Sequence, residues 1–299
     1  MVKTYRLKKK IPDNKVDKLG NTFVKPKQIS LIINHDADVY NEEGQLLLKF
    51  RKNKLKKHHI NSFYDNIVPF MLKHPTQNRG STTGSKKKHV RTNPSVYSTI
   101  VGYFDRWGPS HKVTFKRNNL KKQPLEVRET MFSEQHPQKF KQLLPLVKEI
   151  DVLYKQYIPD KYAKQIKKAR QTYFKISNTS FTTVTTNLNF KTAIHRDKGD
   201  DIEGFGNLAV IEKGKYKGAE TCLPQYGVGV NVRTGDILYM DVHQWHGNLP
   251  MVPIDKDAKR LSIVCYLRKN LWARTKGKTK SFLHKHLSFI RKLKTKKKK

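Results

Sequence analysis

The chain has 299 residues, of which 62 are Lys or Arg and 24 are Asp or Glu, so its formal net charge is +38. This charge indicates a polyanionic partner, most simply nucleic acid, because phosphates that are neutralised by cationic side chains release their counterions. Two cysteines, Cys222 and Cys265, exclude a disulfide framework, and no apolar run approaches the roughly 18 residues of a membrane-spanning helix.

The cysteines and the first residues indicate the compartment. Both cysteines lie in apolar, strand-like contexts, which predicts buried free thiols and a reducing compartment. Residues 1–10 are basic and no apolar segment follows them, so no secretory signal is predicted. We therefore expect an intracellular protein that does not associate with membranes.

Residues 1–60 are predicted to be a basic N-terminal extension that contains strands. Residues 28–34 (QISLIIN) predict one strand, and residues 39–50 could form another with a Glu-Glu-Gly turn inside it. The lysine-rich residues 8–10 and 51–57 are candidates for phosphate contacts, although charged runs usually form a solvated face.

A helix and a loop come next. Apolar side chains recur at helical spacing in residues 61–72, with Asn61 or Ser62 as the N-cap. Residues 77–88 are rich in Gly, Ser, Thr and Lys, which predicts a loop that either approaches phosphates or is exposed to solvent.

Residues 96–107 predict a buried strand or a partly helical segment. The run contains the aromatic residues Tyr103, Phe104 and Trp107. Such side chains can stack on an extruded base, but they more often belong to the core.

Residues 123–157 predict helices, because apolar side chains recur there every three or four residues. Ser133 or Pro137 opens a second helix, and Pro145 is expected to interrupt or kink it. Residues 160–170 predict a further short helix.

From Tyr173 the apolar pattern changes to a period of two, which predicts a β-rich core over residues 173–268. Four strands are predicted in it, at residues 204–211, 227–232, 237–240 and 261–267. The chain beyond Arg268 contains no acidic residue, and residues 280–293 predict an amphipathic helix. A basic C-terminal tail over residues 273–299 would bind nucleic acid, direct the protein to the nucleus or simply be solvated.

Residues that could hold a metal ion lie in this β-rich core. His195 and Asp197 are one residue apart, so in an extended segment both side chains point to the same face. Either His243 or His246 could supply a further ligand after the strand at 237–240. Two imidazoles and one carboxylate with open positions form the facial triad of non-haem Fe(II) oxygenases. The acidic residues within 200–203 are interpreted as a solvated turn.

Arg260 begins the next predicted strand, and Ser262 shares its face. A guanidinium fork suits the distal carboxylate of a dicarboxylic co-substrate such as 2-oxoglutarate, and the hydroxyl adds a donor. Lys259 and Arg268 are the rival cations. Asn187 is a further candidate donor to the co-substrate, although asparagine is also common in turns at strand ends.

The order H-x-D, then G-D with an apolar run, then H, then R-x-S resembles the 2-oxoglutarate/Fe(II) dioxygenase superfamily. Three strings narrow the resemblance, namely T-A-I-H-R-D-K-G-D (192–200), F-G-N-L-A-V (205–210) and D-V-H-Q-W-H-G-N (241–248). They are similar to the TET/J-binding-protein branch, and within it to compact fungal, phage and viral members. The resemblance is good over about residues 181–267 and continues more weakly in N-R-G (78–80) and V-G-Y-F-D-R (101–106).

The resemblance implies a mixed α+β fold with a double-stranded β-helix (jelly-roll) core that helices buttress. The dioxygenase domain is then expected over residues 61–272. The implied iron ligands are His195, Asp197 and His246, with Trp245 facing away from the metal into packing. Arg260 would bind 2-oxoglutarate, assisted by Ser262 and Asn187. The implied cofactors are Fe(II), 2-oxoglutarate as co-substrate, and dioxygen.

The implied reaction is oxidation of the methyl group of a pyrimidine base, 5-methylcytosine or thymine, in DNA. We expect a monomer that acts in the nucleus or wherever viral or phage DNA lies. Two alternatives remain: a protein or small-molecule hydroxylase on the same scaffold, and a non-catalytic nucleic-acid-binding protein.

Overall fold

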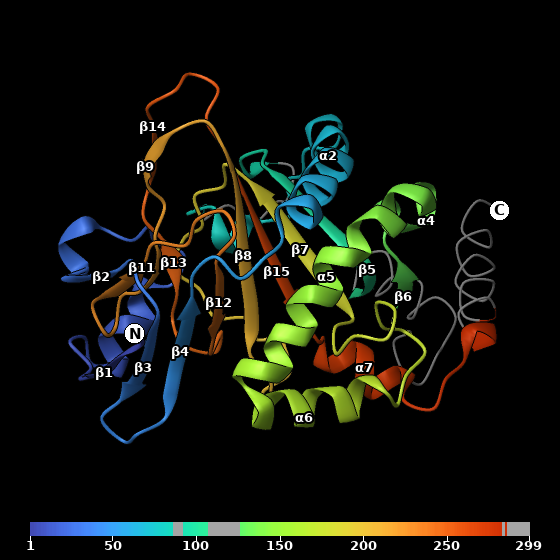
Figure 1. The fold of residues 1–299 in the computed structure, drawn as a ribbon, viewed down its shortest axis with the longest axis horizontal. Coiled ribbons are helices and arrows are strands. Elements are labelled where there is room, and N and C mark those ends of the chain that lie inside the picture. Colours follow the sequence, from blue (N-terminus) through green and yellow to red (C-terminus); the bar gives the residue numbers. More distant parts are fainter. Residues whose placement is uncertain (86–91, 107–125, 283–284, 286–299) are drawn as a thin grey trace.

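The structure is a computed structural model that describes residues 1–85, 92–106, 126–282 and 285. These residues form a mixed α+β fold, as predicted, with sheets of nine, four and two strands (Figure 1). The order in the large sheet is β1 (Lys3–Leu7), β3 (Ala37–Asn41), β4 (Leu46–Arg51), β12 (Ile237–Met240), β8 (Gly206–Lys213), β15 (Lys259–Tyr266), β7 (Thr183–Leu188), β5 (Tyr97–Arg106) and β6 (Glu126–Glu129). The four-stranded sheet has the order β13 (Gly247–Asn248), β10 (Thr221–Leu223), β11 (Val228–Val230) and β2 (Leu31–Ile33), and β14 (Met251–Pro253) pairs with β9 (Tyr216–Gly218).

Strands lie where the N-terminal alternation predicts them, and they take part in both main sheets. β3 and β4 form a hairpin at the Glu-Glu-Gly turn, where Gly44 has a φ of +76° that glycine adopts without a Cβ clash. β4 pairs antiparallel with β12, and β2 pairs parallel with β11. The division of the chain at residues 60 and 272 stays a prediction.

Arg51, a candidate for phosphate contacts, is buried on β4. Its guanidinium lies 2.8 Å from the Asp38 carboxylate and donates to the backbone carbonyls of Ala37 and Phe50. The interpretation of this position as a phosphate contact is therefore wrong, because Arg51 binds a carboxylate of the neighbouring strand.

Helices α2 (Lys57–Lys73), α5 (Pro137–Tyr157) and α6 (Pro159–Ala169) cover one face of the large sheet (Figure 1). The shorter helical segments are α1 (Asp13–Val16), η1 (Asp17–Leu19), η2 (Pro26–Gln28), η3 (Gly80–Thr82), α4 (Met131–Gln135) and α7 (Lys269–Thr275). α5 begins at Pro137, as predicted, and continues through Pro145.

The N-cap prediction for α2 is wrong. The helix begins at Lys57, before Asn61 and Ser62. A contact from α5 explains the earlier start, because the Glu149 carboxylate accepts the Lys56 backbone N–H at 3.2 Å and lies 2.7 Å from His59 Nδ1. A distant residue therefore binds the start of the helix.

The helical prediction also fails at residues 126–129, which form strand β6. This strand pairs antiparallel with the last four residues of β5 and buries Val127. Pairing with β5 overrides the local pattern here, as tertiary contacts commonly do.

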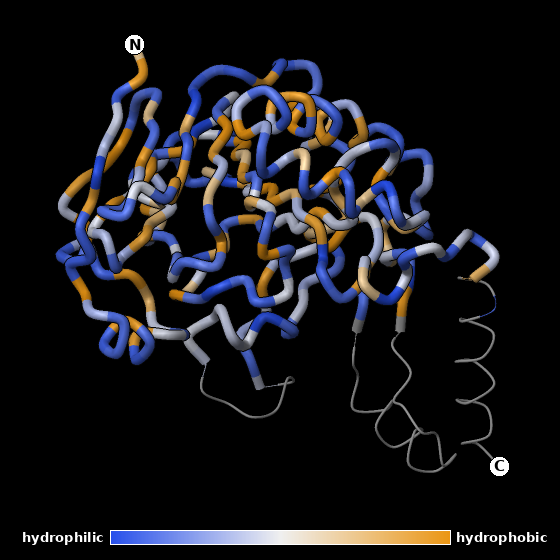
Figure 2. The backbone as a smooth tube through the Cα atoms, turned by 90° about the horizontal axis from the view of Figure 1, so that it is seen from below, coloured by the Kyte–Doolittle hydropathy of each residue, from blue (hydrophilic) through white to orange (hydrophobic). Residues whose placement is uncertain are grey.

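Two apolar clusters fill the space on the two sides of the large sheet. One joins α2 and α5 to the central strands, and the other lies between the large and the four-stranded sheet. The hydrophobic stretches lie mostly in the interior and the hydrophilic ones mostly on the outer loops (Figure 2). Cys222 and Cys265 are buried free thiols, as predicted.

Several sequence predictions fall outside the described residues: Trp107, the lysines at 86–88, the start of the 123–157 segment, and most of the helix at 280–293 with the tail behind it. Among the helices that are described, none has the length and apolarity to cross a membrane.

Candidate active site

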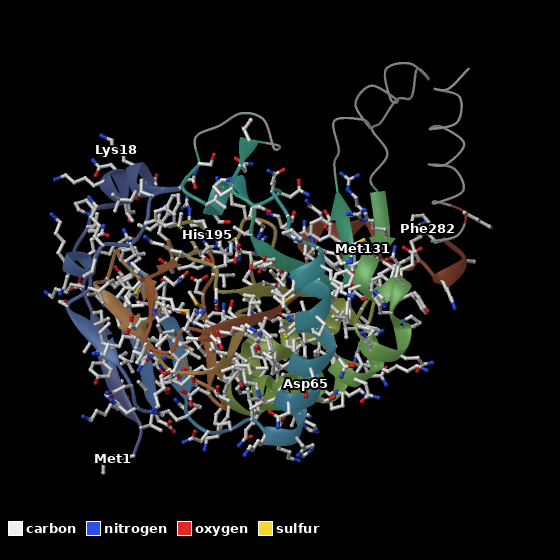
Figure 3. The ribbon with its side chains drawn as sticks, turned by 90° about the horizontal axis from the view of Figure 1, so that it is seen from above. Met1, Lys18, Asp65, Met131, His195 and Phe282 are labelled. Carbon is white, nitrogen blue, oxygen red and sulfur yellow. The ribbon has the colours of Figure 1, made fainter. Side chains whose placement is uncertain are left out.

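A hollow of about 490 Å³, here called the active-site hollow, lies between the two main sheets. Alternate residues of the central strands face it, as strand geometry requires: Gly206 and Leu208 of β8, Thr185 and Asn187 of β7, and Arg260, Ser262, Val264 and Tyr266 of β15. Thr221 of β10 and residues 247–248 of β13 line the other side. Figure 3 labels His195 in a view from above.

His195, Asp197 and His246 meet at this hollow, and one ligand atom from each lies within 4.8 Å of the others. The Nε2 atom of each imidazole lies 3.6 Å from an oxygen of the Asp197 carboxylate. The backbones of His195 and His246 exchange two hydrogen bonds of 2.8 and 2.9 Å, which brings the ring centroids to 4.2 Å. A β-bridge between distant segments therefore sets the spacing of the two imidazoles.

Backbone carbonyls fix the orientation of both imidazoles. His195 Nδ1 lies 2.8 Å from the carbonyl of Ala193, and His246 Nδ1 lies 2.9 Å from the carbonyl of Gln244. A carbonyl can only accept, so each Nδ1 carries the proton and each Nε2 keeps a free lone pair. This is the tautomer that binds a metal, with the second nitrogen held by an outer contact.

The pKa shifts of His195 and Asp197 suit a cation. Burial, and then the neighbouring His246, lower the pKa of His195 to about 4, so its ring is neutral at pH 7. Burial alone would raise the pKa of Asp197, but both imidazoles and Arg79 outweigh it and the pKa lies below its ordinary value. For His246, burial lowers the pKa and Asp197 raises it more, so the net shift is upward. Two nitrogen donors and one carboxylate thus fit a divalent transition metal.

The H-x-D segment is not a strand, which corrects one expectation. It runs through irregular backbone between β7 and β8, and the His195–His246 bridge provides its extended pairing. His243 lies outside the three-residue cluster, with its Nε2 3.4 Å from the carbonyl of Asp201.

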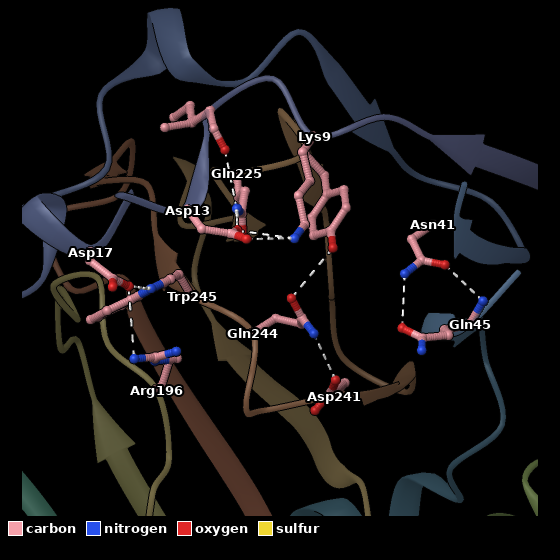
Figure 4. A network of polar contacts seen from close by, with 12 residues as sticks. Lys9, Asp13, Asp17, Asn41, Gln45, Arg196, Gln225, Asp241, Gln244 and Trp245 are labelled. Atoms are coloured by element: carbon pink, nitrogen blue, oxygen red, sulfur yellow. Dashed lines mark hydrogen bonds and ion pairs between the residues drawn. The ribbon is translucent and has the colours of Figure 1, made fainter. Parts of the chain in front are cut away.

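Trp245 faces away from the cluster, as expected, and contacts the N-terminal segment. Its Nε1 donates to Asp17 at 2.8 Å, and the Arg196 guanidinium lies 4.5 Å from the Trp245 ring centroid (Figure 4). Arg196 also lies 3.8 Å from the same Asp17 oxygen. The Asp17 carboxylate therefore contacts both segments that carry candidate ligands, through Trp245 and Arg196.

Arg260 is a buried cation in the wall of the hollow. Its backbone N–H donates to Asn189 Oδ1 at 2.7 Å, which fixes the start of β15. Its Nε has no hydrogen-bond partner within the described part of the chain, and burial lowers its pKa. Burying a cation is costly unless it is paired, so this side chain fits an anionic ligand.

Asn187 lies in a row with Ser98 and Ser262 across β5, β7 and β15. Its Oδ1 accepts the Ser98 hydroxyl at 2.7 Å and Arg79 Nη2 at 3.3 Å, so its amide N–H groups are what it can offer to the hollow. The structure adds Arg79 to the wall of the hollow. The sequence indicates Arg79 only through the N-R-G string.

The interpretation of residues 200–203 as a solvated turn is wrong for two of its acids. Asp200 and Asp201 are buried, whereas Glu203 stays partly exposed beside Lys168. Asp200 lines the hollow; burial and then Asp197 raise its pKa, and the cation Arg268 opposes them. Arg268 forms an ion pair with the buried Asp105.

The sequence is similar to a known family of oxygenases. Residues 114–269 match the family described as the Tet/JBP oxygenase domain of the 2OGFeDO superfamily. The chain is 34% identical over 179 residues to "Thymine dioxygenase JBP1" of Trypanosoma brucei brucei, covering 59% of this chain and 20% of that protein. It is 38% identical over 146 residues to "Bifunctional helicase and thymine dioxygenase JBP2" of Leishmania braziliensis, covering 49% and 13%. The chain thus spans a fifth or less of the length of these relatives.

A solved structure titled "NgTET1 in complex with 5mC DNA" matches with a TM-score of 0.55 and 14% identity, covering 86% of each chain. At this identity the likeness concerns the fold. It confirms the expected double-stranded β-helix core, in which the large and the four-stranded sheet face each other.

Proposed function

Because residues 114–269 carry its oxygenase domain, the chain belongs to the Tet/JBP family of the 2-oxoglutarate/Fe(II) dioxygenase superfamily, and we propose that it oxidises the methyl group of 5-methylcytosine or thymine in DNA. The observation that carries the proposal is the placement of His195, Asp197, His246 and the buried Arg260 around one hollow. The net charge of +38 supports a polyanionic substrate.

In this proposal His195 Nε2, His246 Nε2 and one Asp197 oxygen hold Fe(II). When bound, the metal would supply the activation of dioxygen that couples decarboxylation of 2-oxoglutarate to oxidation of a C–H bond. The carbonyls of Ala193 and Gln244 accept the Nδ1–H of each imidazole, so both Nε2 atoms are directed to the place of the metal. The residues of the chain also shield His246 from bulk water, since this residue is 8% exposed.

Arg260 binds the distal carboxylate of 2-oxoglutarate in this proposal, and Ser262 and Asn187 direct a hydroxyl and an amide to the same molecule. Arg268, the rival cation, lies eight residues farther along the chain and two residues past the end of β15, so the two Cα atoms are up to about 25 Å apart at roughly 3.3 Å per residue. One small dicarboxylate cannot reach both cations. The Arg268 end of the hollow therefore remains for the base.

A base that enters this hollow must leave the duplex stack, at a cost of a few kcal/mol. Phe104 lines the Arg268 end with the guanidinium 4.2 Å from its ring centroid, and Asp200 offers a buried carboxyl there. These groups can contact the face and the polar edge of a base. We also propose that the protein acts as a monomer where DNA is located, with residues 61–272 as the dioxygenase domain.

The test is incubation with Fe(II), 2-oxoglutarate and DNA that contains 5-methylcytosine and thymine, followed by digestion and mass spectrometry of the nucleosides. Oxidised pyrimidines in the wild type that are absent with His195→Ala are the expected result. Succinate release without oxidised nucleosides would point to a protein or small-molecule substrate. If neither oxidised nucleosides nor succinate form, the chain is not a catalyst.

A further inference from the structure

A second hollow of about 410 Å³ lies beside the active-site hollow. It is bounded by the C-terminal end of α2, by β5 and by the start of α4, where Figure 3 labels Met131. The lining residues are Phe70, Lys73, His74, Pro75, Thr76, Ser98, Thr99, Ile100, Phe104, Arg128, Thr130, Met131 and Phe132. Its volume lies within the range of about 300–1,000 Å³ that is usual for small-ligand sites.

The pairing of β5 explains why this space is open. β6 pairs only with the last four residues of β5, Tyr103–Arg106, so it does not cover the preceding edge at residues 98–101. The Thr130 backbone N–H donates to Gly102 O at 2.9 Å and begins the turn into α4, which carries Met131 and Phe132 past that edge. The second hollow is the gap left where the outer strand is shorter than β5.

The two hollows are neighbours that share part of their walls. Thr76, Ser98, Ile100, Phe104 and Arg128 line both of them. A polymer with one unit in the active-site hollow can therefore place its next unit in the second hollow.

The second hollow suits an anion. Lys73, His74 and Arg128 line it, and no carboxylate is among its lining residues. The active-site hollow differs, because Asp197 and Asp200 belong to its wall. Lysine and arginine side chains are the usual contacts of a phosphate.

The second hollow also offers flat and apolar surfaces. The His74 ring lies 4.3 Å from the Phe70 ring, centroid to centroid, and Met131 is 44% exposed. Rings and thioether chains of this kind accept a base by stacking, whatever its identity.

From these observations we propose that the second hollow binds the nucleotide next to the target base on the same DNA strand. Lys73 contacts its phosphate, and the His74 and Met131 surface contacts its base. The proposal rests on the proposed function, because the target base must occupy the active-site hollow. The residues to which it assigns substrate positioning line a hollow that contains none of the candidate metal ligands.

The test measures binding of a fluorescein-labelled single-stranded 5-methylcytosine oligonucleotide by anisotropy. Lys73→Ala removes one exposed cation of the second hollow. Its matched control is Lys141→Ala, which removes an exposed cation of α5 outside both hollows. A second set of oligonucleotides carries a neutral methylphosphonate linkage on the 5′ or the 3′ side of the target. His74→Ala tests the stacking surface without a change at Lys73.

We expect Lys73→Ala to raise Kd about threefold to tenfold and to lower the slope of log Kd against log salt by about 0.7. A neutral linkage on one side of the target should raise the Kd of the wild type by a similar factor. It should leave the Kd of Lys73→Ala unchanged. An equal loss in Lys141→Ala would overturn the proposal, because general charge would then explain binding. Equal sensitivity of Lys73→Ala and the wild type to the neutral linkage would also overturn the proposal. The same holds if polyglutamate displaces the labelled oligonucleotide from the wild type as well as an unlabelled oligonucleotide does.

Binding is measured without turnover, so the two proposals fail in different ways. A wild type that binds the oligonucleotide but produces no oxidised base contradicts the proposed function. A wild type that oxidises the base while Lys73→Ala and His74→Ala bind like wild type contradicts the second hollow alone.

Discussion

Asp17 lies far from the candidate metal ligands in sequence, yet it contacts both segments that carry them. Its Oδ1 accepts the Trp245 indole N–H at 2.8 Å and lies 3.8 Å from the Arg196 guanidinium (Figure 4). Trp245 precedes His246, and Arg196 lies between the two ligands of the H-x-D segment. We predict that Asp17→Ala weakens metal binding although Asp17 is no ligand.

The magnitude follows from the two contacts. A hydrogen bond to a charged group contributes about 1.5–3 kcal/mol, and an exposed ion pair contributes about 0–1 kcal/mol. The Asp17 side chain is 58% exposed, so the lower end of the first range applies. A loss of about 1.5 kcal/mol corresponds to roughly tenfold weaker metal binding, within the tenfold to hundredfold usual for outer contacts of metal ligands.

The assay is anaerobic calorimetric titration with Fe(II), repeated with Co(II) as a redox-stable probe. Asp13→Ala is the matched control, because Asp13 has hydrogen bonds to Lys9 and Gln225 and only a longer-range charge interaction with Arg196. Trp245→Phe should weaken binding to a similar degree, and combining it with Asp17→Ala should add little, since both remove the same bond. Unchanged affinity in Asp17→Ala, or an equal loss in Asp13→Ala, would refute the reasoning.

Three further predictions follow from single positions. Arg260→Lys keeps the charge but loses the fork, so KM for 2-oxoglutarate should rise about tenfold to hundredfold in a succinate assay; an unchanged KM would contradict its role. Cys222 and Cys265 are fully buried, and burial raises the pKa of both thiols, so neither should react with iodoacetamide until the protein is unfolded; rapid labelling of the native protein would contradict this. Gly102 has a φ of +88°, and an added Cβ would lie 2.7–2.8 Å from a side chain and a carbonyl. Gly102→Ala should therefore lower the unfolding free energy by more than about 2 kcal/mol in thermal melts, whereas Gly277→Ala meets no atom within 4 Å and should cost about 1 kcal/mol; equal effects would contradict the steric account.

The sequence alone indicates His195, Asp197, His246 and Arg260, because their signals are local. Each of these residues lies close in sequence to a predicted strand or turn. The strands are recognised from a two-residue alternation of apolar side chains, which a single short segment shows. The same local information places β12 and β15 nearly correctly. It cannot show that H-x-D lies in irregular backbone, because its pairing partner is His246, about fifty residues away.

The failures share one physical cause. Residues 126–129 become a strand because β5 lies beside them, and α2 starts early because Glu149 of α5 binds the Lys56 backbone. Asp200 is buried because its backbone pairs with Arg268, distant in sequence, although its sequence neighbours are typical of an exposed turn. In each case a contact that is distant in sequence overrides a local preference, and no pattern within a short window records it.

The walls of the two hollows divide along the chain in a way that bears on substrate choice. The candidate metal ligands and Arg260 lie within residues 114–269, the part that the family shares. Residues 70–104 supply the facing wall of the active-site hollow, including Arg79 and Phe104, and most of the second hollow. The proposed contacts with substrate therefore come partly from outside the shared part, at Lys73, His74 and Phe104, and partly from within it, at Met131 and Asp200. On this proposal, new residues in the facing wall are one route to a change of substrate that leaves the metal site the same.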